Sequence, residues 1–92
     1  MLSNTCKYQL VDNVLFQKVM DETVILEPEN GHYFTLDPVG TFMIENLQSG
    51  NNIEQVIQNV KNTYNVSASE VEADLQTLIT KMLEQKLLIK GE

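Results

Sequence analysis

The chain has 92 residues, of which 42% are hydrophobic and 21% charged, and this size and composition are typical of a single globular domain spanning residues 1–92. No stretch approaches the ~18 consecutive apolar residues that a membrane-spanning helix needs, and the first residues lack the pattern of a signal peptide, so we expect a cytoplasmic protein with no membrane partner. Six lysines, no arginine and 13 acidic residues give a net charge of −7, which disfavours nucleic acid as a partner.

The acidic residues are concentrated in the middle of the chain. No lysine or arginine occurs between Val19 and Val60, whereas this window holds Asp21, Glu22, Glu27, Glu29, Asp37, Glu45 and Glu54. A partner selected by charge would therefore be neutral or basic. The alternative is that the acidity only keeps a small protein soluble.

The first third of the chain is predicted to form strands. Two apolar, β-rich segments, Val14–Met20 and Thr23–Glu27, are separated by the polar pair Asp21-Glu22, which is consistent with a hairpin. The pair Asn30-Gly31 supplies the two positive-φ positions of a type I′ turn before a third strand at His32–Leu36. We expect a three-stranded antiparallel sheet. The residues before position 12 are ambiguous because no turn signal isolates them.

Three helices are predicted to follow. Asp37 with Pro38 is a helix start signal, and Gly50 ends that helix. Asn52 caps a second helix, and Ser67 with Glu70 forms the capping box of a third, which runs to about residue 85. Residues 87–89 are expected to fold back as an apolar tail. This order of elements predicts a winged-helix-like α+β domain, in which a three-stranded antiparallel sheet precedes three helices.

Side chains suited to catalysis or metal binding are sparse. The chain has one histidine, His32, and one cysteine, Cys6, and no nucleophile motif accompanies either of them. The carboxylates lack the order of a calcium loop, and the four glycines are too far apart to cradle a phosphate. We therefore expect neither enzymatic activity nor a metal or other cofactor.

The predicted strand His32–Leu36 has an unprotected edge. It contains no lysine, proline or internal glycine, the residues that usually block strand addition. An extended peptide could therefore pair with it as a further strand. The third helix carries an apolar stripe, Val71, Leu75, Leu78, Ile79 and Met82, and part of it would wall a groove beside this strand, with the last four as the candidate lining. The alternative is that the core takes up these side chains, because a chain of this size has few to spare.

Five segments of the chain, in order and spacing, carry a family resemblance: Gly31–Gly40 (GHYFTLDPVG), Ile44–Gly50 (IENLQSG), Ile53–Val56 (IEQV), Tyr64–Val66 (YNV) and Glu72–Leu75 (EADL). With them, residues 24–88 resemble the PqqD-like proteins, the recognition elements for ribosomally made, modified peptides. The chain departs from that family in lacking the tryptophan often found near Ile44 and in having Lys86-Leu87 where the family has Gly-Leu.

The resemblance implies a non-catalytic domain that binds the leader segment of a precursor peptide and presents it to modifying enzymes. The contacts carried over by position are His32, Tyr33, Phe34, Thr35, Leu36, Val71, Asp74, Leu75, Leu78 and Met82. A domain of this size looks most like the stand-alone recognition proteins of lasso-peptide pathways, whose partners are a leader peptidase and a cyclase. PqqD proper, which serves a radical enzyme in quinone-cofactor synthesis, would look much the same.

Two other functions stay open at this point. A winged-helix DNA-binding regulator fits the order of elements, but the third helix begins with Glu70, Glu72 and Asp74, which phosphates would repel. An adaptor could instead pair residues 32–36 with the same strand of a second copy. Peptide recognition by a monomer is the function that we expect.

Overall fold

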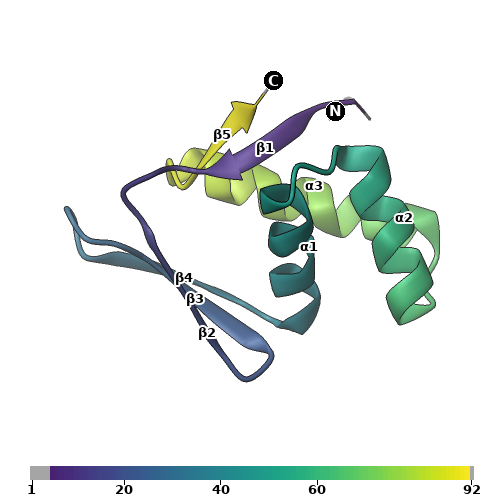
Figure 1. Cartoon of the computed structure of the whole chain (residues 1–92), viewed down its shortest axis with the longest axis horizontal. Coiled ribbons are helices and arrows are strands. Elements are labelled where there is room, and N and C mark those ends of the chain that lie inside the picture. Colours follow the sequence, from purple (N-terminus) through teal and green to yellow (C-terminus); the bar gives the residue numbers. More distant parts are fainter. Residues whose placement is uncertain (1–4, 92) are drawn as a thin grey trace.

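A computed structural model describes residues 5–91 (Figure 1). Its elements are β1 (Lys7–Leu10), β2 (Leu15–Val19), β3 (Glu22–Glu27), β4 (His32–Leu36), α1 (Pro38–Gln48), α2 (Ile53–Tyr64), α3 (Ala68–Glu84) and β5 (Leu88–Gly91). The antiparallel sheet β2-β3-β4 precedes three helices, which confirms the predicted α+β class. Within residues 5–91, no helix is long and apolar enough to cross a membrane.

The turn that joins β3 to β4 differs from the prediction. Only Gly31 of the pair Asn30-Gly31 has a positive φ, of 71°, so the predicted type I′ turn is wrong. The connection is a four-residue loop closed on Glu27, whose carboxylate accepts hydrogen bonds from the backbone N–H groups of Glu29 (2.8 Å) and Asn30 (3.0 Å). The Gly31 N–H donates to the Glu27 carbonyl at 3.0 Å. The side chain of Glu27 therefore sets the turn.

The helix starts follow the capping signals of the sequence. The Asp37 carboxylate accepts a hydrogen bond from the Gly40 N–H at 2.7 Å, as predicted. A complete capping box links Asn52 and Gln55 at the start of α2. At the start of α3, the Ser67 hydroxyl accepts from the Glu70 N–H at 3.3 Å. The Glu70 carboxylate accepts from that hydroxyl at 3.4 Å and not from the Ser67 N–H, so only half of the predicted box forms.

The two ends of the described chain pair with each other. The predicted fold-back of residues 87–89 is confirmed, and it forms β5, which pairs antiparallel with β1 in the register Leu10↔Leu88 to Lys7↔Gly91 (Figure 1). This resolves the ambiguity of the residues before position 12. The amino-terminal strand thus lies in a second, two-stranded sheet and does not extend the sheet that contains β4.

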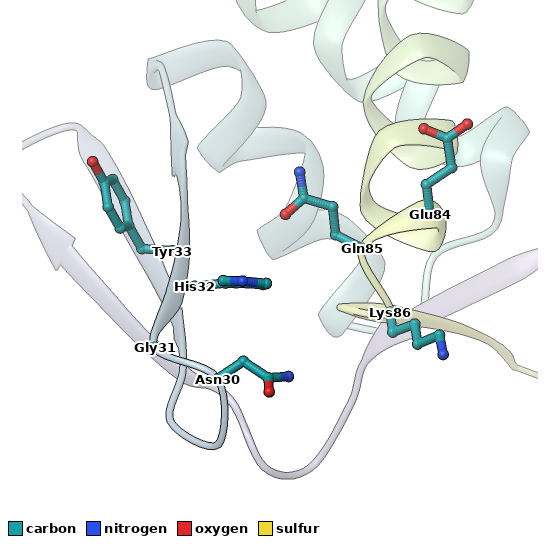
Figure 2. Close-up of a pocket in the computed structure, with 7 residues that line it drawn as sticks. All are labelled: Asn30, Gly31, His32, Tyr33, Glu84, Gln85 and Lys86. Atoms are coloured by element: carbon teal, nitrogen blue, oxygen red, sulfur yellow. The ribbon is translucent and has the colours of Figure 1, made fainter.

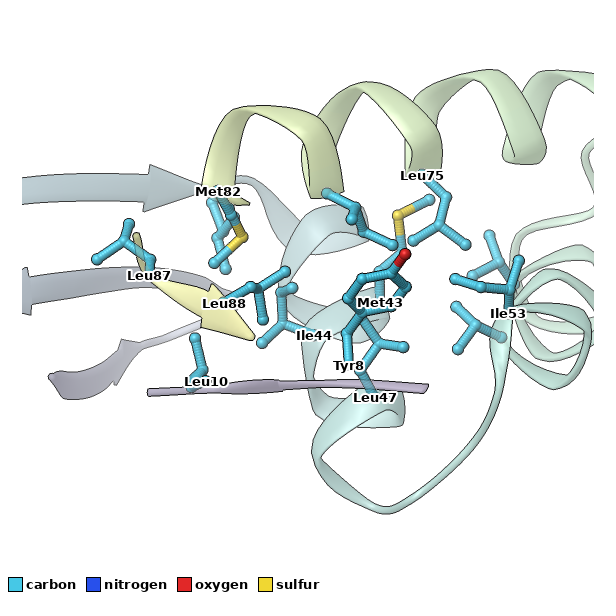
Figure 3. Packing of buried hydrophobic residues seen from close by; sticks show 14 of the residues in the cluster. Tyr8, Leu10, Met43, Ile44, Leu47, Ile53, Leu75, Met82, Leu87 and Leu88 are labelled. Atoms are coloured by element: carbon cyan, nitrogen blue, oxygen red, sulfur yellow. The ribbon is translucent and has the colours of Figure 1, made fainter. Parts of the chain in front are cut away.

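The core lies between the helices, the β1-β5 pair and one face of the larger sheet. Figure 3 shows Tyr8 and Leu10 of β1 and Leu88 of β5 packing toward α1 and α3. The sheet contributes Ile25, which is fully buried, and the Thr41 hydroxyl of α1 donates to the buried Thr23 hydroxyl of β3 at 2.9 Å. These contacts fix the sheet on α1, and they hold β4 at a set position relative to α3.

Candidate functional site

β4 is an edge strand of its sheet. It pairs antiparallel with β3, from Glu27↔His32 to Thr23↔Leu36, and no other strand within residues 5–91 pairs with it. Alternate residues lie on opposite faces of a strand, and here Leu36 is buried and Phe34 partly buried, whereas Tyr33 is 69% exposed. The free edge therefore presents backbone N–H and C=O groups between an apolar inner side and a solvent-facing outer side.

The opposite edge of the sheet, at β2, is protected differently. Lys18 is the fourth of the five residues of β2, and its ammonium group forms an ion pair with Glu45 of α1 at 3.1 Å. A lysine in an edge strand disfavours addition of another strand. β4, which carries no lysine, is the edge more open to an extended peptide.

A groove runs beside the inner side of β4. Its first part has a volume of about 580 Å³, and its wall comprises Phe34, Thr35, Leu36, Asp37, Val39, Gly40, Met43, Asp74, Thr77, Leu78 and Lys81. β4, the start of α1 and the middle of α3 thus form its three sides. The first helical turn of α1 approaches β4 closely, because a Cβ at Gly40 would lie 3.1 Å from the Asp37 carboxylate and 3.5 Å from the Leu36 side chain.

A second hollow continues along β4 toward its beginning. It measures about 680 Å³ and lies between residues 30–33 and residues 84–86 (Figure 2). In Figure 2 the His32 ring points toward Gln85 at the end of α3, whereas the Tyr33 ring points to the other side of β4. The two hollows together accompany β4 from His32 to Leu36, which gives the groove the length of the strand. We call this combined surface the β4–α3 groove.

The structure divides the predicted helix contacts into two groups. Asp74 and Leu78 line the β4–α3 groove. Val71, Leu75 and Met82 are in the core, with exposures of 2%, 0% and 0%, so they present no surface to a ligand. The alternative that the core takes up part of the apolar stripe therefore applies to these three residues and to Ile79.

Thr77 and Lys81 of α3 are among the residues of the groove wall that sequence reasoning missed. Together with Asp74 and Leu78 they occupy positions i, i+3, i+4 and i+7 of α3, the spacing of one helix face. A helical-wheel projection would have found this face. A search for apolar stripes misses it, because the face mixes polar, charged and apolar side chains. The groove wall is thus acidic at Asp74, apolar at Leu78 and basic at Lys81.

The end of α3 contains an unusual backbone conformation. Lys86 has a φ of 61°, a left-handed value that glycine adopts without steric cost. It lies in the hollow at the start of β4 and begins the turn that leads into β5. A glycine would fit this position better than lysine.

Within residues 5–91, no three histidine, cysteine, aspartate or glutamate side chains come close enough together to hold a metal ion. The site is instead an open strand edge with an apolar floor and a mixed helix wall. Such an arrangement defines a winged-helix-like α+β domain suited to holding an extended polypeptide.

Comparison with known proteins places the chain in a family. The sequence profile described as coenzyme PQQ synthesis protein D (PqqD) matches residues 22–88, which include β3, β4 and all three helices. The chain therefore belongs to the PqqD family, as the resemblance indicated. No curated protein matches it significantly.

Two solved structures are similar over most of the chain. TbiB1 in complex with the TbiA(beta) leader peptide is 30% identical, with a TM-score of 0.80 over 87% of this chain and 93% of that one. Lasso peptide synthetase B1 complexed with the leader peptide is 20% identical, with a TM-score of 0.82 over 90% of this chain and 98% of that one. The lasso peptide synthetase B1 structure supports the fold, and the TbiB1 structure supports both the fold and the family.

Proposed function

We propose that this protein is a non-catalytic, cytoplasmic recognition element that binds the leader segment of a ribosomally made precursor peptide. The leader adds to β4 as a fourth strand and places alternate side chains in the β4–α3 groove. The protein then presents the precursor to a leader peptidase and a cyclase. The open β4 edge beside an apolar groove is the observation that carries this proposal.

The residues of the site have distinct roles in this proposal. The backbone of His32, Tyr33, Phe34, Thr35 and Leu36 supplies the hydrogen bonds to the leader, which gives affinity independent of leader sequence. Phe34 and Leu78 form the apolar surfaces on the two sides of the groove, and they select apolar leader side chains. Asp74 and Lys81 contact polar positions of the leader. Val71, Leu75 and Met82 act from the core by fixing α3 opposite β4.

Lasso-peptide biosynthesis is the pathway that the comparisons favour. Both similar structures hold a leader peptide, and one of them is described as a lasso peptide synthetase B1. The family name itself belongs to quinone-cofactor synthesis. The similarity to two leader-bound proteins over most of the chain is the reason to propose precursor recognition, and the description of one of them is the reason to propose a lasso pathway.

N-methylated leader peptides test strand addition without changing the protein. In an antiparallel or parallel ladder, every second N–H of the added strand points toward β4, so methylation at those positions removes a hydrogen bond and introduces a steric clash. Calorimetry with a series of singly N-methylated leaders is expected to show affinity losses with a period of two residues. Equal affinities along the series, or losses without this period, would contradict strand addition.

DNA binding is tested separately. Retention of labelled duplex DNA on a filter at low salt, decreasing steeply as salt is added, would support the winged-helix regulator instead. We expect no retention, because Glu70, Glu72 and Asp74 are exposed along the first turns of α3.

A further inference from the structure

The β4–α3 groove changes in chemical character along its length. In the hollow that extends toward α1, the apolar lining side chains are Phe34, Leu36, Val39, Met43 and Leu78. In the hollow at the start of β4, the side chains of His32 and Gln85 approach each other from the two walls, and both are polar (Figure 2). His32 and Phe34 lie on the same side of β4, because they are two residues apart. A strand added to β4 therefore meets a polar and an apolar environment on one of its sides.

One face of α3 joins the two hollows. Lys81 lines the first hollow and Gln85 lines the second. The two residues are one helical turn apart, since the Gln85 N–H donates to the Lys81 carbonyl at 3.1 Å, so they lie on the same side of the helix. Lys81 thus stands where the apolar part of the groove meets the polar part. We call His32, Lys81 and Gln85 the polar end of the groove.

The side chains of the polar end have hydrogen-bonding capacity that the fold does not use. Within residues 5–91, the ammonium group of Lys81 forms no ion pair, since Lys18 with Glu45 is the only pair there. Neither the His32 ring nor the Gln85 side chain has a hydrogen-bond partner in the described part of the chain. An ammonium group, an imidazole N–H and a carboxamide are all donors, and a carboxylate can accept from each of them.

Formal charges distinguish the two ends of the groove. Lys86 and Glu84 also border the hollow at the start of β4, but they have opposite charges, and in Figure 2 both side chains point away from β4. Lys81 is therefore the charge that decides at the polar end. Asp37 and Asp74 line the other end, beside the end of β4. An acidic ligand side chain is attracted to the polar end and repelled from the opposite one.

We infer that the polar end of the β4–α3 groove binds an aspartate or glutamate side chain of the leader, and that this contact sets the register of the bound leader. The inference rests on the proposed function. Residues directly opposite each other in neighbouring strands point to the same side of a sheet, so the leader residue opposite His32 points into the polar end. Its carboxylate accepts hydrogen bonds from the Lys81 ammonium group and the Gln85 amide.

The same geometry specifies a spacing in the leader. Side chains on one side of a strand are two positions and about 6 to 7 Å apart. The leader side chain between Phe34 and Leu78 is therefore two positions from the acid, and its surroundings favour an apolar residue. A slip of one residue would turn both side chains out of the groove. A slip of two toward the end of β4 would place the carboxylate among apolar side chains and nearer to Asp74.

Lys81→Gln tests the polar end, because it removes the charge and keeps a polar residue that favours helix. The matched control is Lys90→Gln, which removes the same charge from an exposed position of β5 outside the groove. The probes are a synthetic leader of the precursor encoded beside this protein and a series of leaders in which each acidic residue is replaced singly by its amide. Calorimetry at low salt is expected to show about three- to tenfold weaker leader binding by Lys81→Gln and unchanged binding by Lys90→Gln.

A double-mutant cycle between protein and leader identifies the contact. One amide-substituted leader is expected to lose about as much affinity for wild type as the native leader loses for Lys81→Gln. Combining the two changes should cost little more than either alone, because both remove the same interaction. The difference between wild type and Lys81→Gln should also shrink at high salt, which screens a charge contact and leaves a purely structural effect in place.

The outcomes separate this inference from the proposed function. Failure of wild type to bind any leader refutes the proposed function itself. Leader binding by Lys81→Gln at wild-type strength, losses in the cycle that simply add, or an equal loss in Lys90→Gln would overturn only the contact at the polar end. A critical acid with no apolar residue two positions away on either side would overturn the register.

Discussion

Replacing Leu75 or Leu78 with alanine makes the same chemical change at two neighbouring positions of α3, with opposite expected consequences. Leu75 is fully buried in the core, whereas Leu78 is partly exposed and lines the β4–α3 groove. Leu75→Ala should therefore lower stability and leave the groove wall in place. Leu78→Ala should lower leader affinity, with a smaller effect on stability.

The magnitudes follow from burial. Truncating a fully buried leucine costs about 2 to 5 kcal/mol of unfolding free energy, because the transfer term and the cavity term add. Leu78 is already partly covered, so Leu78→Ala should cost about 1 kcal/mol of stability. In the complex, loss of its contacts with the leader should cost about 1 to 2 kcal/mol of binding free energy, a loss of affinity of about five- to thirtyfold.

Urea denaturation measures the first quantity, and fluorescence anisotropy of a labelled leader measures the second. Leu83→Ala is the matched control, because Leu83 lies on α3, is 38% exposed and does not line the groove, so neither quantity should change much. Binding of leader by Leu78→Ala as tightly as by wild type, at concentrations where the variant is folded, would refute the role of Leu78 in the groove. A loss of affinity in Leu83→Ala as large as that in Leu78→Ala would refute it equally.

Three further predictions concern the fold that holds the site. Lys86→Gly should raise the free energy of unfolding by about 0.5 to 1 kcal/mol in urea titrations, because the φ of 61° at this position is costly for any residue with a Cβ. Asp37→Ala should lower it by about 1 kcal/mol through loss of the N-cap of α1, and Asp37→Asn should restore most of that loss. Burial, with a smaller contribution from Cys6, raises the pKa of Tyr8 above its ordinary value of 10.0. The free energy of unfolding should therefore keep its full value below pH 10 and fall as the pH rises through the raised pKa. Tyr8→Phe should remove this part of the alkaline loss of stability. If the variant loses stability with rising pH just as wild type does, the prediction is wrong.

Local signals in the sequence predicted the local structure well. The N-caps Asp37, Asn52 and Ser67 depend only on residues up to three positions away, and all three occur in the structure. The prediction of a type I′ turn before β4, by contrast, was wrong. Asn-Gly favours a type I′ turn, but the carboxylate of Glu27 binds two loop amides and stabilises a longer loop. A side chain outside the turn thus outweighed the preference of the residues within it.

Local sequence signals could not predict the long-range pairing of β1 with β5. β1 and β5 lie at opposite ends of the chain, and only their shared position beside α1 and α3 brings them together. The groove wall illustrates the same limit. Periodicity identifies a stripe on α3, but Leu75 faces the core and Leu78 faces β4, and this distinction depends on where β4 lies. Positions three residues apart, such as Leu75 and Leu78, differ by only about 60° around the helix axis, so the groove face lies beside the core face.

The proposed function depends on the edge of β4 being free to pair with the leader. Amide hydrogen exchange with and without leader measures this directly. Alternate N–H groups of β4 point away from β3, and these should exchange readily in the free protein and become protected when the leader pairs with them. We predict slower exchange at alternate residues within 32–36 and unchanged rates at residues 15–19 on the β2 edge. Unchanged rates in β4 at saturating leader, or protection confined to β2, would contradict the account.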